Sequence, residues 1–131
     1  MNFSKTTLYS VQVLKYMADN PSDNHTASSL SRILEIPHQY LRHIMTSLSK
    51  SGYISGSAGR NGGFLISRDL DTISIAEIID KCEGLDNLQK CIIGNDKCTY
   101  NGTCSLHEFW ETTRQEIIKK LKTTNLRNFK Y

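Results

Sequence analysis

Hydrophobic and polar positions recur with a helical period in three segments of the first half of the chain. Residues 4–19 form the first segment, and a polar loop, 20–25, separates it from the second. Thr26 or Ser28 can cap this second, short helix. The third helix is expected over residues 38–50, with its apolar residues on one face and a glycine just beyond its end. Three such helices, the last two joined by a tight turn, are typical of a helix-turn-helix.

Two short runs of strand-forming residues, 53–55 and 64–66, follow the third helix. The segment between them is rich in glycine, which predicts a β-hairpin with a flexible tip. A helix-turn-helix followed by a two-stranded hairpin has the plan of a winged helix-turn-helix. The expected fold class is therefore mainly α with a small β-hairpin wing.

The second half of the chain predicts two more helices with a polar loop between them. Ser74 and Glu77 have the spacing of a capping box, and the helix that they begin is expected to run through Lys81 or Cys82. Gly84 then lies where this fourth helix would end. From residue 105 onward, apolar residues at helical spacing predict a long final helix.

Basic and acidic residues are unevenly distributed along the chain. The net charge is +3, and no aspartate or glutamate occurs between Glu35 and Asp69. The basic residues of this interval are Arg42, Lys50, Arg60 and Arg68. A stretch without carboxylates suits a surface that faces phosphates, because DNA binding is dominated by charge neutralisation. So small an excess is also common on solvated surfaces, and it gains meaning only from its position over the third helix and the wing.

The third helix of a helix-turn-helix lies in the major groove, where its first residues meet base edges. Arg42 can make a bidentate contact with guanine, Gln39 can do so with adenine, and Tyr40 is a candidate for a phosphate or base contact. The candidate DNA-binding residues are His38, Gln39, Tyr40, Arg42 and His43 on the helix, with Arg60, Asn61 and Gly62 on the wing. Winged helices also serve as protein-binding modules, so an interaction role without DNA is the alternative.

Three cysteines and a histidine lie in one short polar stretch: Cys91, Cys98, Cys104 and His107. Thiolates are soft ligands for iron–sulfur clusters, zinc and copper, and imidazole is a common further ligand. Cys82 lies on an apolar helix face and is expected to be a buried small hydrophobe.

No apolar run approaches the roughly 20 residues of a membrane span, and the N-terminus lacks the pattern of a secretory signal. A cytoplasmic protein without a membrane partner is expected, in which cysteines are more often ligands or redox groups than structural disulfides.

These features together resemble the Rrf2 family of bacterial winged helix-turn-helix transcription regulators, over nearly the whole chain. The matching motifs are the N-terminal residues 4–9 with the amphipathic pattern that follows them, Tyr40-Leu41, the wing Gly59-Arg60-Asn61-Gly62-Gly63-Phe64, Ile75-x-x-Ile78-Ile79, and the three spaced cysteines. The resemblance implies a homodimer built on the final helix, double-stranded DNA sites with paired half-sites, and an iron–sulfur cluster as the usual sensing device. The expected segments are a winged helix-turn-helix DNA-binding domain, 1–84, a cysteine-containing cluster-binding loop, 85–104, and a dimerisation helix with its tail, 105–131.

The resemblance also bears on the ligands of such a cluster. Members of the iron–sulfur assembly branch place a histidine three positions after the third cysteine, as His107 follows Cys104 here. Members of the nitric-oxide branch use an N-terminal carboxylate from the partner subunit, whereas this chain has Leu8 at that position. The expected ligands are therefore Cys91, Cys98, Cys104 and His107, although His107 could also be an ordinary polar surface residue. A 2Fe–2S cluster is preferred and a 4Fe–4S cluster is possible. Zinc is the second choice, since structural zinc ligands are usually more closely paired.

Two other functions fit the same residues. The same DNA-binding fold could lack a cluster and respond through oxidation of its thiols or through a partner protein, as in the cysteine-metabolism branch of the family. The chain could also be an interaction module or cluster carrier that does not bind DNA. Catalysis and a small-molecule substrate are not expected, because the cysteines and histidine lack an orienting acid and nothing resembles a nucleotide-binding loop.

Overall fold

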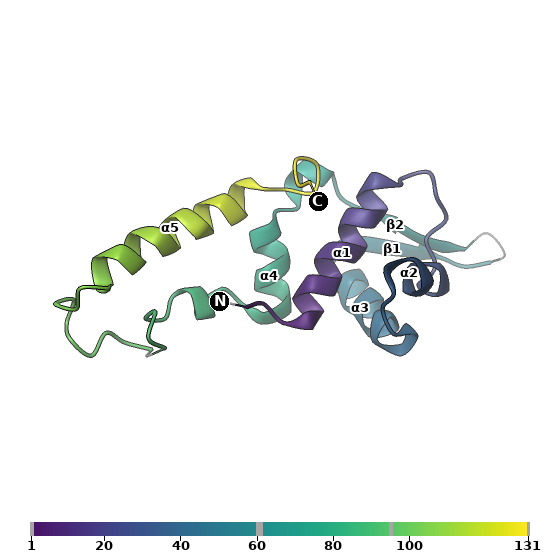
Figure 1. The fold of residues 1–131 in the computed structure, drawn as a ribbon. Helices are drawn as coiled ribbons and strands as arrows, with labels where there is room; N and C mark the ends of the chain where they lie inside the picture. Colours follow the sequence, from purple (N-terminus) through teal and green to yellow (C-terminus); the bar gives the residue numbers. More distant parts are fainter. Residues whose placement is uncertain (1, 60–61, 95, 131) are drawn as a thin grey trace.

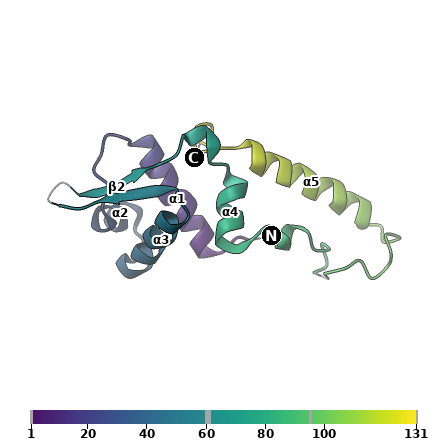
Figure 2. The same cartoon turned by 180° about the vertical axis from the view of Figure 1, so that it is seen from behind.

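The computed structural model of the chain describes residues 2–59, 62–94 and 96–130. Its elements in chain order are α1 (Lys5–Asp19), α2 (Ala27–Leu34), α3 (His38–Lys50), β1 (Ile54–Ser57), β2 (Gly63–Ile66), the 3₁₀ helix η1 (Leu70–Thr72), α4 (Ile75–Glu83), the 3₁₀ helix η2 (Asp86–Leu88) and α5 (His107–Thr123). β1 and β2 pair antiparallel, from Ile54 opposite Ile66 to Ser57 opposite Gly63. Figures 1 and 2 show α1, α2, α3 and the hairpin gathered at one end, α4 beside α1, and α5 projecting away with the loop that precedes it. The predicted fold class, mainly α with a small hairpin wing, is confirmed.

Side-chain caps explain where α2 and α4 begin. Thr26 and Ser29 form a complete capping box, in which each side chain bonds the other residue's backbone N–H. Ser74 accepts a hydrogen bond from the N–H of Glu77 at 3.1 Å, as the sequence predicts. The Glu77 carboxylate, however, bonds the guanidinium of Arg68 instead of completing the box. A charged partner brought close by the fold offers a stronger hydrogen bond than the backbone N–H.

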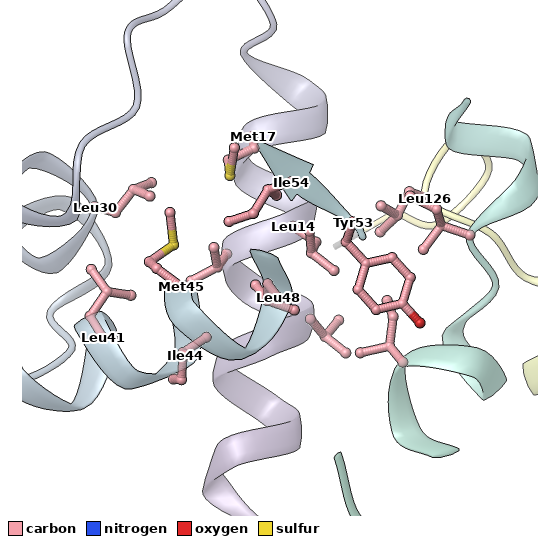
Figure 3. Close-up of a cluster of buried hydrophobic side chains, with 14 of the residues drawn as sticks. Leu14, Met17, Leu30, Leu41, Ile44, Met45, Leu48, Tyr53, Ile54 and Leu126 are labelled. Atoms are coloured by element: carbon pink, nitrogen blue, oxygen red, sulfur yellow. The ribbon is translucent and has the colours of Figure 1, made fainter. Parts of the chain in front are cut away.

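The apolar faces of α1, α3 and α4 meet in one core, part of which Figure 3 shows. Its nearly inaccessible members include Leu14, Met17, Leu30, Leu41, Met45, Tyr53, Ile78 and Leu126. The buried residues of α3 fall on one side of that helix because they lie three and four residues apart. The core therefore decides which side of α3 remains exposed.

The base of the wing is attached to the loop between α1 and α2. The backbone N–H of Phe64 donates to the carbonyl of His25 at 2.7 Å. The side-chain amide of Asn24 donates to the carbonyl of Gly62 at 3.1 Å. These contacts hold the hairpin against the helix-turn-helix, so the wing and α3 have a fixed relative position.

The chain after α5 returns to the winged domain. The N–H of Leu126 donates to the carbonyl of Ile73 at 3.0 Å, and the N–H of Ile75 donates to the carbonyl of Thr124 at 2.8 Å. The buried ammonium of Lys15 donates to the carbonyl of Leu126 at 3.3 Å. The Leu126 side chain is 1% exposed and belongs to the core. The sequence pattern grouped this tail with the final helix, whereas in the structure the tail packs on the winged domain.

One carboxylate attaches the end of α4 to the start of α1. Glu83 Oε2 accepts hydrogen bonds from the backbone N–H of Ser4 at 2.8 Å and from the hydroxyl of Thr7 at 2.5 Å. The bond from Thr7 is the main cause that holds the pKa of Glu83 below its ordinary range. The ionised form of Glu83 therefore stabilises the contact between the two helices.

This contact predicts a pH dependence of stability. Because the folded-state pKa of Glu83 is lowered, its contribution is present above the unfolded-state pKa and is lost as the pH falls through the folded-state value. We expect the wild-type protein to lose more stability than Glu83→Gln on acidification from about pH 6 to about pH 3. Urea denaturation at several pH values measures the difference, with Glu108→Gln at an exposed position of α5 as the control. Equal losses in wild type and Glu83→Gln would contradict the prediction.

Candidate nucleic-acid interface and cysteine loop

The side of α3 opposite the core carries three of the residues expected to meet DNA. Gln39, Arg42 and His43 are exposed and lie three or four residues apart, on one side of the helix. Among the described residues Arg42 takes part in no ion pair. This side of α3 therefore presents an unpaired cation and two further hydrogen-bonding side chains.

The other two candidates on α3, His38 and Tyr40, make contacts within the protein. The His38 ring nitrogen lies 3.3 Å from Ser28 Oγ on α2, and the side chain stays exposed. The Tyr40 hydroxyl lies 2.5 Å from Thr6 Oγ1, and its ring packs edge-on against Tyr9 with the centroids 5.4 Å apart. Tyr40 is half-buried and holds the first turn of α3 against α1, so its hydroxyl already has a partner.

Of the three wing candidates, Arg60 and Asn61 lie outside the described residues and Gly62 lies within them. The N–H of Gly62 donates to the carbonyl of Gly59 at 2.9 Å. A Cβ atom at Gly62 would come within 2.5 Å of the carbonyl oxygen of Ser57. Gly62 is therefore required by the close approach of the backbone in the turn.

Arg68 lies in the carboxylate-free stretch but is occupied within the protein. Its guanidinium bonds Glu77 Oε1 at 2.6 Å and the carbonyl of Thr72 at 2.7 Å, and it lies 5.4 Å from the centroid of the Tyr53 ring. The hydrogen bond from Arg68 is the main cause that holds the pKa of Glu77 below its ordinary range. The sequence therefore overstates the free positive charge of the stretch, because the carboxylate that neutralises Arg68 comes from α4.

The three loop cysteines and His107 line one cavity of about 160 Å³ beside the start of α5. All three thiols are free and partly exposed. The cavity is also lined by apolar side chains, including Ile92. The fold thus places three side chains of the loop and His107, the first residue of α5, around one cavity.

Hydrogen bonds attach the start of this loop to α5. The indole N–H of Trp110 donates to the carbonyl of Lys90 at 2.7 Å. The guanidinium of Arg114 donates to the carbonyl of Gln89 at 2.6 Å. Leu88, just before them, is 2% exposed. The segment that leads into the cavity is therefore fixed to the same helix that carries His107.

The donor chemistry of the cavity suits a metal cofactor. Three thiols and an imidazole are ligands of both iron–sulfur clusters and zinc. The N–H of Gly102 donates to Cys98 Sγ at 3.2 Å, and hydrogen bonds to the sulfur ligands tune clusters of this kind. Within the described residues, no three histidine, cysteine, aspartate or glutamate side chains are gathered as a single metal ion needs. The four side chains therefore share the lining of one cavity and do not form the close tetrahedron of a structural zinc site.

The fourth cysteine, Cys82, lies away from the cavity. It is on α4, and its sulfur is 3.5 Å from the hydroxyl oxygen of Ser10 on α1. It is partly buried and packs against the core. Cys82 therefore belongs to the interface between α1 and α4 and not to the set of loop cysteines.

The long helix α5 lies wholly within the described residues, and none of its side chains is buried. Its C-terminal part packs on α4 and the core through Leu121. Phe109 is 60% exposed, and Ile117 and Ile118 are partly exposed. Apolar residues on the surface of a projecting helix are typical of an interaction face. In the described part of the chain, no helix is long and apolar enough to cross a membrane.

A family model and a related protein both identify similarity to transcriptional regulators. The Rrf2 model, described as an iron-dependent transcriptional regulator, matches residues 3–130. An HTH-type transcriptional regulator of Aquifex aeolicus (strain VF5) is 28% identical over 130 residues, which cover 98% of this chain and 90% of the relative.

Solved structures share the fold at low sequence identity. CymR (YrzC), the global cysteine regulator of B. subtilis, has a TM-score of 0.81 at 18% identity, over 98% of this chain and 95% of that one. IscR of T. potens has a TM-score of 0.74 at 20% identity, over 98% and 85%. The oxidized form of Staphylococcus aureus CymR has a TM-score of 0.75 at 19% identity, over 98% and 94%. The likeness extends from the winged domain through the long C-terminal helix.

The family model covers nearly all of the chain, including the helix-turn-helix, the wing and α5. Because the family consists of transcriptional regulators, the chain is not an enzyme, and an interaction module without DNA binding is not supported. The chain belongs to the Rrf2 family of DNA-binding transcriptional regulators.

Proposed function

We propose that this regulator is a cytoplasmic homodimer and that an iron–sulfur cluster in the cysteine loop controls its affinity for double-stranded promoter DNA. The observation that carries the proposal is the placing of Cys91, Cys98, Cys104 and His107 around one cavity. These four residues would hold the cluster, as 2Fe–2S by preference and as 4Fe–4S otherwise, and zinc is the second choice. When bound, such a group supplies a redox centre whose potential depends on its ligands and on exposure to solvent.

The homodimer is supported by the exposed apolar residues of α5. Phe109 is exposed and Ile117 and Ile118 are partly exposed within one chain. A second copy of α5 would bury their apolar surface, which is favourable in water. In this arrangement residues 1–84 read DNA, residues 85–104 hold the cluster, and residues 105–131 dimerise through α5 and return to the winged domain. Two α3 helices would then meet half-sites about one DNA turn apart, roughly 34 Å.

The contacts at the two ends of α5 support a mechanical link between the cavity and DNA. At one end, Trp110 and Arg114 bond the start of the cysteine loop. At the other end, Thr124 and Leu126 bond the segment that begins α4. A change in the loop would therefore shift α5 relative to the winged domain, and with it the spacing of the two α3 helices.

The test is to purify the full chain without oxygen, count iron and sulfide per chain, and record absorption and circular dichroism spectra. We expect a visible cluster spectrum whose shape identifies the cluster. Trp110, the one tryptophan of the sequence, lines the cavity, so its fluorescence should fall on reconstitution with iron and sulfide. Protein that stays colourless and iron-free after reconstitution would refute the cluster and leave DNA binding standing.

Arg42→Gln is expected to relax the base preference of the regulator. Arg42 is exposed, unpaired among the described residues and placed in the first half of α3, where a bidentate contact to guanine is worth about 1–3 kcal/mol of discrimination. Selection from a pool of randomised duplexes measures the preference at each position. We expect one position of each half-site to lose its preference.

Arg32→Gln is the matched control for this substitution, because Arg32 is exposed on α2 and outside the reading side of α3. We expect Arg32→Gln to keep the wild-type preference at every position. An unchanged preference in Arg42→Gln would show that Arg42 does not read a base.

Direct control by thiols is the second candidate. Cys91, Cys98 and Cys104 are free and partly exposed around a common cavity, so an oxidant can reach all three thiols. One of the similar structures is the oxidized form of a CymR protein. Protein that binds no iron, yet changes its DNA affinity on treatment with diamide, would favour this candidate.

A further inference from the structure

A second basic surface lies at the C-terminal end of α3, and it shares only His43 with the residues expected to read bases. Lys50 from α3 and Lys81 from α4 line one open hollow of about 420 Å³. The side chains between them are polar: His43, Thr46, Ser47 and Ser51. Both lysines are exposed, and neither forms an ion pair among the described residues.

Among the described residues, no carboxylate near Lys81 forms an ion pair with it. Glu77, one turn earlier on α4, bonds the guanidinium of Arg68, and the charge of Lys81 is only a minor cause of its lowered pKa. Asp80 is adjacent to Lys81 in sequence, and adjacent residues of a helix point in different directions. The hollow therefore keeps two positive charges and several hydroxyl groups, which is the composition of a phosphate-binding surface.

The hollow lies on the reading side of α3. Gln39, His43, Thr46 and Lys50 follow one another at intervals of three and four residues, so they share one side of the helix. Eight residues separate Arg42 from Lys50, a rise of about 12 Å along the helix. The major groove is itself about 12 Å wide. A helix that enters the groove with its first residues therefore carries Lys50 to the phosphates at the edge of the groove.

We propose that Lys50 and Lys81 bind the sugar–phosphate backbone of DNA beside the major groove, and that the DNA interface extends from the helix-turn-helix onto α4. This inference rests on the DNA-binding function of the family. Phosphate contacts of this kind fix the position of the protein on the duplex without reading its sequence. α4 is then both a DNA-contacting element and the helix that directly precedes the cysteine loop.

The experiment measures binding of full-length Lys81→Gln and Lys50→Gln to a fluorescein-labelled duplex of random sequence, by anisotropy at several salt concentrations. Each phosphate contact contributes about 0.9 to the slope of log K against log salt. A dimer whose two copies both contact the duplex loses two phosphate contacts for each substitution, so we expect the slope to fall by about 1.8 in each variant. Affinity should fall by the same factor for random duplexes and for duplexes selected by the wild-type protein.

Lys122→Gln, at an exposed position of α5, is the matched control and should keep the wild-type slope. Lysines in the last turn of a helix also stabilise its C-terminal carbonyls, so thermal unfolding is measured on every variant. A lowered melting temperature with an unchanged salt slope would overturn the proposal and assign both lysines to helix stability. Wild-type protein whose binding to every duplex is absent or independent of salt would overturn the DNA-binding function as well.

Discussion

Leu126→Ala is expected to lower the free energy of unfolding by about 2–5 kcal/mol, the range for truncating a fully buried leucine. The Leu126 side chain is 1% exposed and belongs to the buried cluster of which Figure 3 shows part. It belongs to a segment of only a few residues after α5, so its loss also weakens the attachment of α5 to the winged domain. Urea denaturation at one fixed protein concentration measures the effect, because the stability of a dimer depends on concentration.

Leu65→Ala is the matched control, since the Leu65 side chain is 57% exposed on β2. A substitution on such a surface changes stability by about 0.5 kcal/mol or less. Similar losses in Leu126→Ala and Leu65→Ala would show that the tail is not part of the core. Lys15→Met removes the bond from Lys15 to the Leu126 carbonyl and also the ion pair with Asp19, so we expect it to lower the free energy of unfolding as well.

Cys98→Ala is expected to abolish iron binding and the visible spectrum of the anaerobic protein, and to change its DNA affinity. Cys98 is one of the four side chains around the cavity, and its sulfur already accepts a hydrogen bond from the N–H of Gly102. Loss of one ligand leaves a cluster incompletely held, and the loop around it loses the group that would order it. Iron and sulfide counts, absorption spectra and DNA-binding curves on the same samples measure the three effects.

Cys82→Ala is the matched control, because it removes a thiol from the interface of α1 and α4 and leaves the cavity intact. We expect this variant to keep its iron and its DNA affinity. If Cys98→Ala lost its iron but kept the DNA affinity and base preference of the wild type, the proposed link between the loop and DNA would be wrong. If neither variant bound iron, and diamide changed the DNA affinity of Cys82→Ala but not of Cys98→Ala, direct control by the thiols would replace the proposed control by a cluster.

The order and type of the helices could be predicted from the sequence, because their signals are local. Apolar residues at helical spacing identify α1, α3 and α5, and Thr26 and Ser74 mark the starts of α2 and α4. Gly84 ends α4 with a positive φ of 80°, a conformation that glycine adopts at little cost. The wing was also predictable, since glycines separate its two short strands.

The candidate site was predictable as a set of residues and not as an arrangement. The sequence shows Cys91, Cys98, Cys104 and His107, but the cavity also needs Trp110 and Arg114 to hold the start of the loop on α5. No local pattern shows that an indole will bond a carbonyl twenty residues earlier. The same limit applies to Lys50 and Lys81, which only the packing of α3 and α4 brings to one hollow.

The sequence by itself determined the winged helix-turn-helix plan, the side of α3 that stays exposed and the grouping of three cysteines with a histidine, since each depends on residues close together in the chain. The tertiary structure alone decided three features: Arg68 is neutralised by Glu77, Tyr40 is bound to Thr6, and Leu126 returns to the core. Each of these depends on a partner from a distant element. A side chain's free charge, free hydroxyl or apolar surface is fixed by what packs against it, and that partner is specified only by the fold.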